Sequence, residues 1–217
     1  MKYIAICFAF LMLEGCVSTI KTSLKLPYSD QAPALQLVDK RPKGQSDQAI
    51  MSLNLSNCQY GSYQIGESNE SPNRIKVLEN YLSKRVGDKF ESKTANVVNF
   101  VIHVNAAARL KGGLSKTYGD NFLADTIIQK EVIGCSNDDL YGGYSIGELT
   151  DEFSPLIAIV DLEIDGKVYH GRAVKSLEGK DWGPKNPKWD SLMQGVILQA
   201  GDDLIRSIKD GQFTTAD

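Results

Sequence analysis

The residue types that most often carry metal or acid–base chemistry are scarce in this chain. Among 217 residues there are two histidines, His103 and His170, each in a segment with strand-like alternation. A metal site or an acid–base pair would need both imidazoles to converge. The sequence holds neither His-Glu-x-x-His nor Cys-x-x-Cys to supply more ligands. We therefore expect no catalytic residue, no metal and no cofactor, and keep a His/carboxylate site as the alternative.

An acidic stretch rich in glycine and tyrosine, residues 136–152, is a second place where chemistry could reside. Its carboxylates lack the spacing of an EF-hand, so a solvated loop is the simpler interpretation. Tyr141 and Tyr144 flank a Gly-Gly pair there, and tyrosine gives contact area at low entropic cost. Together with Trp182, which follows two charged residues, they are our candidates for contact with a ligand or partner.

The N-terminal residues have the pattern of an export signal. A lysine precedes eleven apolar residues, 3–13, a run too short for a membrane-spanning helix of roughly 20 residues. The motif Leu13-Glu14-Gly15-Cys16 resembles the lipobox of bacterial lipoproteins, although that family usually has a small or apolar residue where Glu14 stands. The resemblance implies a signal peptide over residues 1–15, cleavage before Cys16, and attachment of lipid, palmitate included, at Cys16.

The same resemblance implies a location. Lipoproteins of this kind carry three acyl chains, which suffice for anchoring where one chain binds a membrane only marginally. Val17 follows the cysteine, and the Asp that tends to retain such proteins in the inner membrane is absent there. This favours the outer membrane, with the domain facing the periplasm. The expected partners are the membrane and an envelope protein, and a net charge of −3 argues against nucleic acid.

Two further cysteines, Cys58 and Cys135, stand in loop-like contexts within the domain. In an oxidising periplasm such a pair tends to form a disulfide. Closing so long a span would stabilise the fold by about 4 kcal/mol in the chain-entropy model. Two unpaired buried thiols are the alternative. A cysteine nucleophile is disfavoured because no histidine stands in a recognisable relation to either residue.

Hydrophobic periodicity predicts one domain over residues 34–210, between a flexible tether at 16–33 and a C-terminal tail at 211–217. Strands are expected at 34–39, 50–55 and 97–109, and the segment 56–70 is expected to be loop. A hairpin is expected over 156–175, because Asp165-Gly166 is a type I′ turn pair. Residues 122–133 fit a helix or a strand equally.

Two amphipathic helices complete the predicted fold. Ser71-Pro72 is typical of a helix start, and the apolar stripe that follows ends at Gly87. A longer helix is expected from Trp189, with Trp189 in the core and an apolar stripe that continues to Ile208. The fold class is therefore α+β, a mostly antiparallel sheet with two amphipathic helices packed on one face.

The order of these elements resembles the YajG-like lipoproteins of the Gram-negative envelope. The likeness rests on the strand that ends in Leu37-Val38-Asp39-Lys40-Arg41, the Pro-started helix with Leu78 and Leu82, the strand 97–102, the hairpin and the C-terminal helix. It implies a lipid-anchored, non-catalytic module that binds or assembles another envelope component, for which an edge strand could serve. The alternative is an enzyme that hydrolyses peptidoglycan or lipid through His103 or His170.

Overall fold

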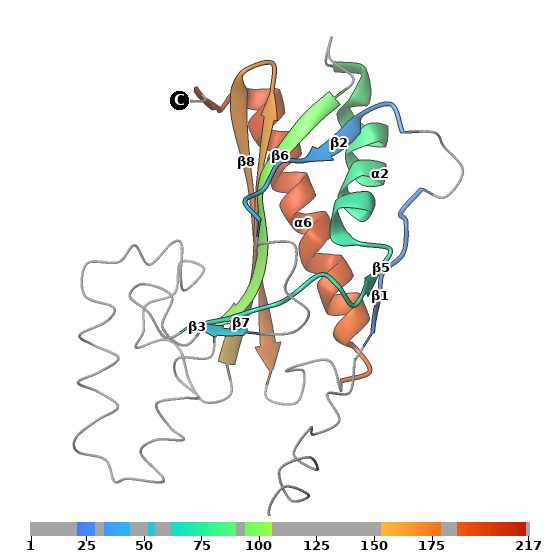
Figure 1. Cartoon of the computed structure of the whole chain (residues 1–217), viewed down its shortest axis with the longest axis vertical. Helices are drawn as coiled ribbons and strands as arrows, with labels where there is room; N and C mark the ends of the chain where they lie inside the picture. Colours follow the sequence, from blue (N-terminus) through green and yellow to red (C-terminus); the bar gives the residue numbers. More distant parts are fainter. Residues whose placement is uncertain are drawn as a thin grey trace, which may run out of the picture.

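The computed structural model describes residues 21–28, 33–43, 52–54, 62–89, 94–105, 153–178 and 186–215. Within them a sheet of seven strands is accompanied by two α-helices, α2 (Arg74–Val86) and α6 (Trp189–Asp210) (Figure 1). The strands follow the order β3-β4-β6-β7-β8-β9, with β2 also beside β6. Only the β2–β6 pair in this sheet is parallel, so the predicted α+β class with a mostly antiparallel sheet is confirmed.

Three long strands form the centre of the sheet: β6 (Thr94–Asn105), β7 (Phe153–Ile164) and β8 (Lys167–Glu178). Asp165 and Gly166 join β7 to β8 with φ values of 52° and 71°, which confirms the predicted hairpin turn. This turn sets which residues of β7 and β8 lie opposite each other. It therefore decides which side chains share a face.

One edge of β6 is shared between two short strands. β2 (Gln36–Asp39) lies parallel to its first residues, and β4 (Ser62–Gln64) lies antiparallel to its last. β3 (Ser52–Asn54) pairs in turn with β4. The strands predicted near 34–39 and 50–55 are thus present, but β4 falls where a loop was predicted. Three residues are too few for alternation to reveal a strand.

Helix α2 begins two residues later than the sequence suggested. Its N-cap is Asn73, whose Oδ1 accepts a hydrogen bond from the Lys76 amide at 2.9 Å, and Ser71 belongs instead to β5 (Glu70–Ser71). The predicted apolar stripe and the basic last turn are both present. The helix ends at Gly87 as expected, and a short 3₁₀ turn, Gly87–Lys89, follows.

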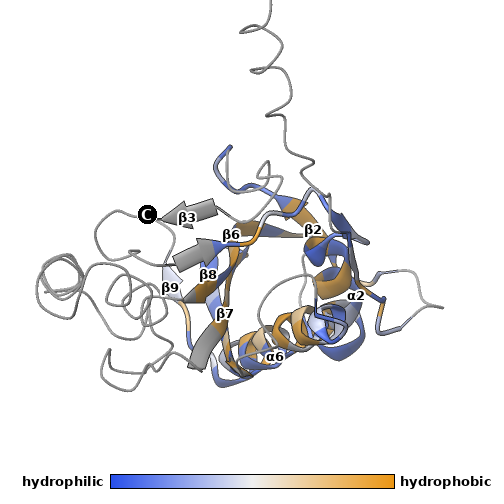
Figure 2. Cartoon of the chain, turned by 90° about the horizontal axis from the view of Figure 1, so that it is seen from below, coloured by the Kyte–Doolittle hydropathy of each residue, from blue (hydrophilic) through white to orange (hydrophobic). Residues whose placement is uncertain are grey.

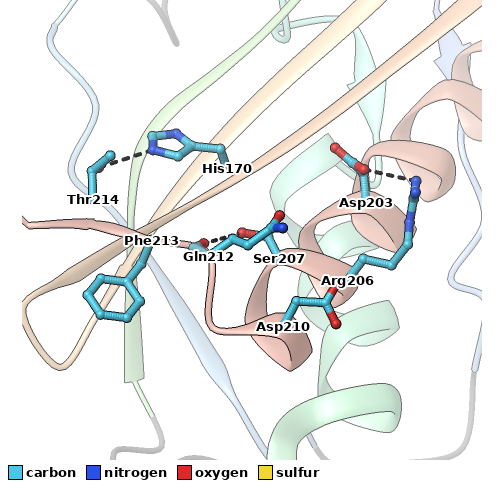
Figure 3. Close-up of a pocket in the computed structure, with 8 residues that line it drawn as sticks. All are labelled: His170, Asp203, Arg206, Ser207, Asp210, Gln212, Phe213 and Thr214. Carbon is cyan, nitrogen blue, oxygen red and sulfur yellow. Dashed lines mark hydrogen bonds and ion pairs between the residues drawn. The ribbon is translucent and has the colours of Figure 1, made fainter.

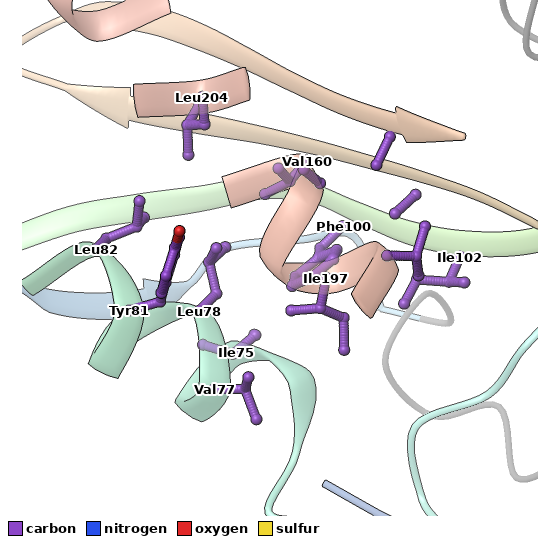
Figure 4. Close-up of a cluster of buried hydrophobic side chains, with 14 of the residues drawn as sticks. Ile75, Val77, Leu78, Tyr81, Leu82, Phe100, Ile102, Val160, Ile197 and Leu204 are labelled. Carbon is purple, nitrogen blue, oxygen red and sulfur yellow. The ribbon is translucent and has the colours of Figure 1, made fainter. Parts of the chain in front are cut away.

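The hydrophobic core lies between the helices and one face of the sheet (Figures 2 and 4). Helix α6 packs on β8 and β7, and α2 packs on α6 and β2. Gly171 allows the close approach of α6, because a Cβ there would lie 2.5 Å from the Ala200 carbonyl oxygen. Trp189 is 1 % exposed, which confirms its predicted place in the core. No helix in the described part combines the length and the apolar run that a membrane crossing requires.

The N-terminal segment differs from the predicted tether. β1 (Thr22–Ser23) pairs with β5, and Leu24 is buried. The Ser23 amide donates to Asp190 Oδ1 at 3.1 Å, and the Lys25 amide donates to Gln194 Oε1 at 2.8 Å. The tether prediction is therefore wrong for residues 21–28. Their composition is that of a linker, and the contacts that hold them come from a helix far along the chain.

The C-terminal residues also join the sheet. After α6, Gly211 takes a left-handed conformation (φ 66°) and turns the chain back. β9 (Thr214–Thr215) then pairs with the first two residues of β8, and the Phe213 ring lies 5.9 Å from that of Tyr169. The prediction of a free tail is wrong for residues 211–215, because two paired residues leave no periodicity to detect.

Candidate functional site

The sheet face away from the helices carries the polar groups that are not needed for the core. We call it the outer face. Alternation along the three central strands places these residues on it: Val101 and His103 of β6, Ile157, Ile159 and Asp161 of β7, and His170, Arg172 and Val174 of β8. Ile157 is fully buried but stands apart from the cluster between sheet and helices. The outer face therefore contains a second buried patch.

One row of the outer face forms a chain of hydrogen bonds across four strands. Asn99 Nδ2 donates to Asp161 Oδ2 at 3.0 Å, and Asp161 Oδ1 lies 2.8 Å from His170 Nδ1. On its other side, His170 Nε2 lies 3.1 Å from Thr214 Oγ1. A histidine held between a carboxylate and a hydroxyl has the connectivity of a nucleophilic triad. The chain fixes the plane of the His170 ring.

His170 also borders an open pocket of about 590 Å³ at the edge of β8 (Figure 3). The pocket is lined by α6 and by the returning C-terminal residues, and it includes the carboxylates of Asp203 and Asp210. Arg206 pairs with Asp203 at 2.8 Å, and the side chains of Arg206 and His170 are 71 % and 53 % exposed. The site is open to water, and a water-filled site weakens the electrostatic stabilisation that acyl transfer needs.

Arg172 is the least expected residue of the outer face. The residue as a whole is half-buried, but its Nε and Nη2 atoms are buried, and neither is hydrogen-bonded to any of the described residues. Leaving a buried charged donor unpaired costs more than the 1–3 kcal/mol typical of a neutral group, so proteins rarely tolerate it. Its backbone amide, in contrast, donates to Asp203 Oδ2 at 2.9 Å and so closes that point of the sheet edge. The backbone amide of Arg172 is therefore hydrogen-bonded, whereas the Nε and Nη2 atoms of its side chain bind no described residue.

The described carboxylates near Arg172 are already engaged. Asp161, one row along the outer face, uses one oxygen for Asn99 and the other for His170. Asp203 binds the Arg172 amide and the Arg206 guanidinium. Glu163 contacts Asn96 at 3.4 Å. None of these three carboxylates is hydrogen-bonded to the Nε or Nη2 atom of Arg172.

His103 shares the outer face with Arg172, and the two side chains interact electrostatically. Burial, together with the positive charge of Arg172, lowers the pKa of His103 to about 4. The imidazole is therefore neutral at physiological pH. It can donate one N–H and accept one hydrogen bond, so it adds a polar group beside Arg172 without adding charge.

Two other buried arginines show the opposite arrangement. Arg41, at the end of β2, donates from Nε to Asp39 Oδ1 at 2.9 Å and from Nη2 to Asp39 Oδ2 at 2.8 Å. It also reaches Glu67 and the Phe100 carbonyl oxygen. The hydrogen bonds from Arg41 hold the pKa of Asp39 below its ordinary value. This guanidinium is surrounded by acceptors.

Arg74, at the start of α2, repeats that geometry. It donates from Nε to Glu70 Oε2 at 3.0 Å and from Nη2 to Glu70 Oε1 at 2.5 Å. Nη2 also donates to the Ile65 carbonyl oxygen, and Glu67 lies 3.6 Å from Nε. Its side chain is 1 % exposed, as is that of Glu70. In both arginines a carboxylate therefore binds the Nε–Nη2 edge, the edge that Arg172 leaves unpaired.

The predicted site residues are only partly placed by the structure. Cys16, Cys58, Cys135, Tyr141, Tyr144 and Trp182 lie outside the described residues. The two histidines lie on the same face but do not converge. His103 shares a row with Val174, and Val174 is four residues from His170, about 13 Å along the strand. A joint site of His103 and His170 is therefore excluded by the register, whereas His170 alone contacts Asp161 and borders the pocket that Asp203 and Asp210 line.

Sequence reasoning missed Arg172 and its surroundings. Once the turn at Asp165-Gly166 is accepted, alternation places Arg172 between His170 and Val174 on one face, so its position could have been found. Its lack of a partner could not, because that depends on where Asp161 and Asp203 direct their oxygens. Among the described residues, no three His, Cys, Asp or Glu side chains gather to hold a metal ion. The chain matches no protein-family model, no curated protein and no solved structure.

Proposed function

We propose that this chain is a lipid-anchored module on the periplasmic face of the outer membrane, which binds or helps to assemble another envelope component without catalysis. The observation that carries the proposal is Leu13-Glu14-Gly15-Cys16 after an apolar run, with a folded domain close behind it. The N-terminal motif would supply the membrane anchor, and the folded domain would supply the binding surface. Its one histidine with carboxylates lies in a pocket open to water.

The docked N-terminal segment supports a position close to the bilayer. Cys16 precedes Lys21 by five residues, and an extended chain spans at most about 3.5 Å per residue, so the anchor lies within about 18 Å of the domain. The end that carries β1, β5 and the start of α6 then faces the membrane. The outer face carries the half-buried apolar residues Val101, Ile159 and Val174, and we take these as the surface for a partner beside the membrane.

The anchor is tested by metabolic palmitate labelling. Cys16→Ala is expected to abolish labelling and to release the protein from the membrane fraction. Cys7→Ala, within the apolar run, is the matched control and should leave both unchanged. Labelling that persists in the Cys16→Ala variant would contradict the anchor.

The binding surface is tested in cells by photo-crosslinking. A photoreactive residue at Val174 on the outer face is expected to give discrete crosslinked bands in the membrane fraction. The same residue at exposed Lys84 on α2 should give none of these bands. Equal crosslinking from both positions would contradict the choice of the outer face.

A hydrolase acting on peptidoglycan or lipid is the second candidate, and one observation favours it. His170 lies between Asp161 and Thr214 and borders a pocket with two further carboxylates. The full chain would then release product from one of these substrates, and His170→Ala would abolish that release. Product that is absent, or that forms equally with His170→Ala, rejects this candidate.

A further inference from the structure

We propose that residues 21–26, which we call the basal segment, form a surface through which the domain lies on an anionic lipid bilayer. In this contact Lys21 and Lys25 bind lipid phosphates, and Leu26 enters the boundary between headgroups and acyl chains. The inference rests on the proposed lipid anchor, which brings the segment to the membrane. It adds a second membrane contact, made by the folded domain itself.

The basal segment turns one side to the core and the other to solvent. Thr22 and Leu24 are 5 % and 4 % exposed, whereas Lys21, Ser23 and Lys25 are all exposed. The backbone fixes this alternation, because the segment pairs with β5 and donates two amides to side chains of α6. The two lysine side chains therefore leave the same side of the segment, about 13 Å apart along an extended chain.

The charges that this end of the described chain presents to solvent are mostly positive. Lys21 and Lys25 are joined by Lys188, which is exposed immediately before the first residue of α6. The carboxylate beside them belongs to Asp190, whose Oδ1 accepts the Ser23 amide at 3.1 Å. Three lysines and one aspartate leave two positive charges. Such a cluster attracts anionic lipid once it lies within about 10 Å of the membrane surface.

The proposed anchor holds the basal segment near that surface. Cys16 and Lys21 can be at most about 18 Å apart, and any less extended path brings the lysine closer. Leu26 follows Lys25 and is 42 % exposed. A single exposed leucine is ordinary on a protein surface, but one placed next to cations near an acyl anchor suits the headgroup boundary.

A domain held in this way has a defined orientation. The basal segment is bound to α6, so it lies on the helix side of the sheet and away from the outer face (Figure 1). Acyl chains on one residue leave the domain able to turn, whereas a second contact fixes the side that meets the bilayer. The outer face then points away from the lipid and toward a partner.

The test is photo-crosslinking to lipid in vesicles that hold the lipidated protein. A photoreactive residue at Leu26 is expected to give lipid adducts in vesicles of equal parts phosphatidylcholine and phosphatidylglycerol. The control is the same residue at Phe213, which is also 42 % exposed and lies beyond the other end of α6, about 30 Å away. Its adduct yield should be at least about fivefold lower.

Charge reversal tests the lysines. Lys21→Glu with Lys25→Glu should lower the adduct yield from position 26 at least about fivefold, because each lysine at an anionic surface strengthens binding by about that factor. Vesicles of phosphatidylcholine alone should lower it similarly. Lys84→Glu with Lys89→Glu makes the same change in net charge at exposed positions near the end of α2, and it should leave the yield unchanged.

Two results would overturn this inference: equal adduct yields from positions 26 and 213, and equal effects of the two charge-reversed variants. A protein that carries palmitate and stays with the vesicles, but gives no lipid adducts from position 26, would overturn it while leaving the anchor intact. A protein without palmitate would overturn the anchor and this inference together.

Discussion

Two regions of this domain place arginine in a buried setting, and they differ in what surrounds the charge. Beneath the start of α2, Arg41 and Arg74 are enclosed by three carboxylates and by backbone oxygens. On the outer face, the half-buried Arg172 has two buried nitrogens, and no described residue supplies an acceptor for them. A buried charge whose partners are complete belongs to the architecture. Buried donor atoms without a partner lower stability, so the fold does not depend on them.

The paired arginines and Arg172 also lie in different parts of the molecule. The paired network joins β2, the approach to β5 and the start of α2. Arg172 lies in the middle of β8, where its backbone pairs opposite Ile159 of β7, and its Nε and Nη2 atoms bind no described residue. Loss of the Arg172 side chain is therefore expected to lower the free energy of unfolding much less than loss of the Arg74 side chain.

The largest effect is expected from Arg74→Met. The substitution leaves Glu70 and Glu67 buried without their partner, and breaking a buried pair in this way costs about 3–5 kcal/mol of unfolding free energy. Urea unfolding followed by circular dichroism measures the loss. The double variant Arg74→Met with Glu70→Leu is the control and should lose less than the single variant. A single variant as stable as the wild type would remove the structural half of the comparison.

A smaller effect is expected from acid. The pKa of His103 is about 4 in the folded protein and ordinarily 6.5, so the unfolded chain binds a proton more readily. Stability is therefore expected to fall as the pH drops from about 6.5 to 4, by up to about 3 kcal/mol. His103→Gln should remove this part of the acid sensitivity in unfolding curves recorded across the range.

The variant Arg172→Met gives a second measurement on the pKa of His103. Because the charge of Arg172 contributes to the low pKa of His103, the variant should show a higher pKa for His103 in an NMR titration. An unchanged pKa in the variant would mean that the two side chains do not interact on the outer face.

A still smaller effect is expected from Asp161→Asn. The substitution weakens a partly exposed contact with His170, and it should cost about 1 kcal/mol in urea unfolding. Thr214→Val, which removes the other contact of His170, is the matched comparison and should cost less, because Thr214 is exposed. A loss near that of Arg74→Met would mean that the hydrogen bonds of Asp161 and His170 hold the fold together, as those of Arg74 do.

The fold could be predicted where long elements carry a period. The apolar stripes of α2 and α6 and the Asp165-Gly166 turn suffice for the class and for the faces of β7 and β8. The strands β1, β4 and β9 are too short to show hydrophobic alternation. They form because backbone groups find partners far along the chain, as the Lys25 amide does at Gln194. Propensity over two or three residues does not determine such contacts.

The candidate site could be predicted only in part. Alternation places His170 and Arg172 on one face, but it does not say that Asn99 and His170 occupy both oxygens of Asp161. The burial and pairing of Arg41 and Arg74 could not be predicted either, since both are charged residues in segments that look solvent-exposed in the sequence. Burial of a charge is decided by the assembled fold, so its partners become visible only there.

The most direct test of the account is the unfolding free energy of Arg172→Met, measured in urea beside Arg74→Met. Because the substitution removes two buried donor atoms that no described residue pairs, Arg172→Met is expected to be as stable as the wild type or more stable, by up to about 2 kcal/mol. A loss by Arg172→Met comparable to that of Arg74→Met would contradict the claim that the Arg172 side chain, unlike that of Arg74, does not hold the fold together.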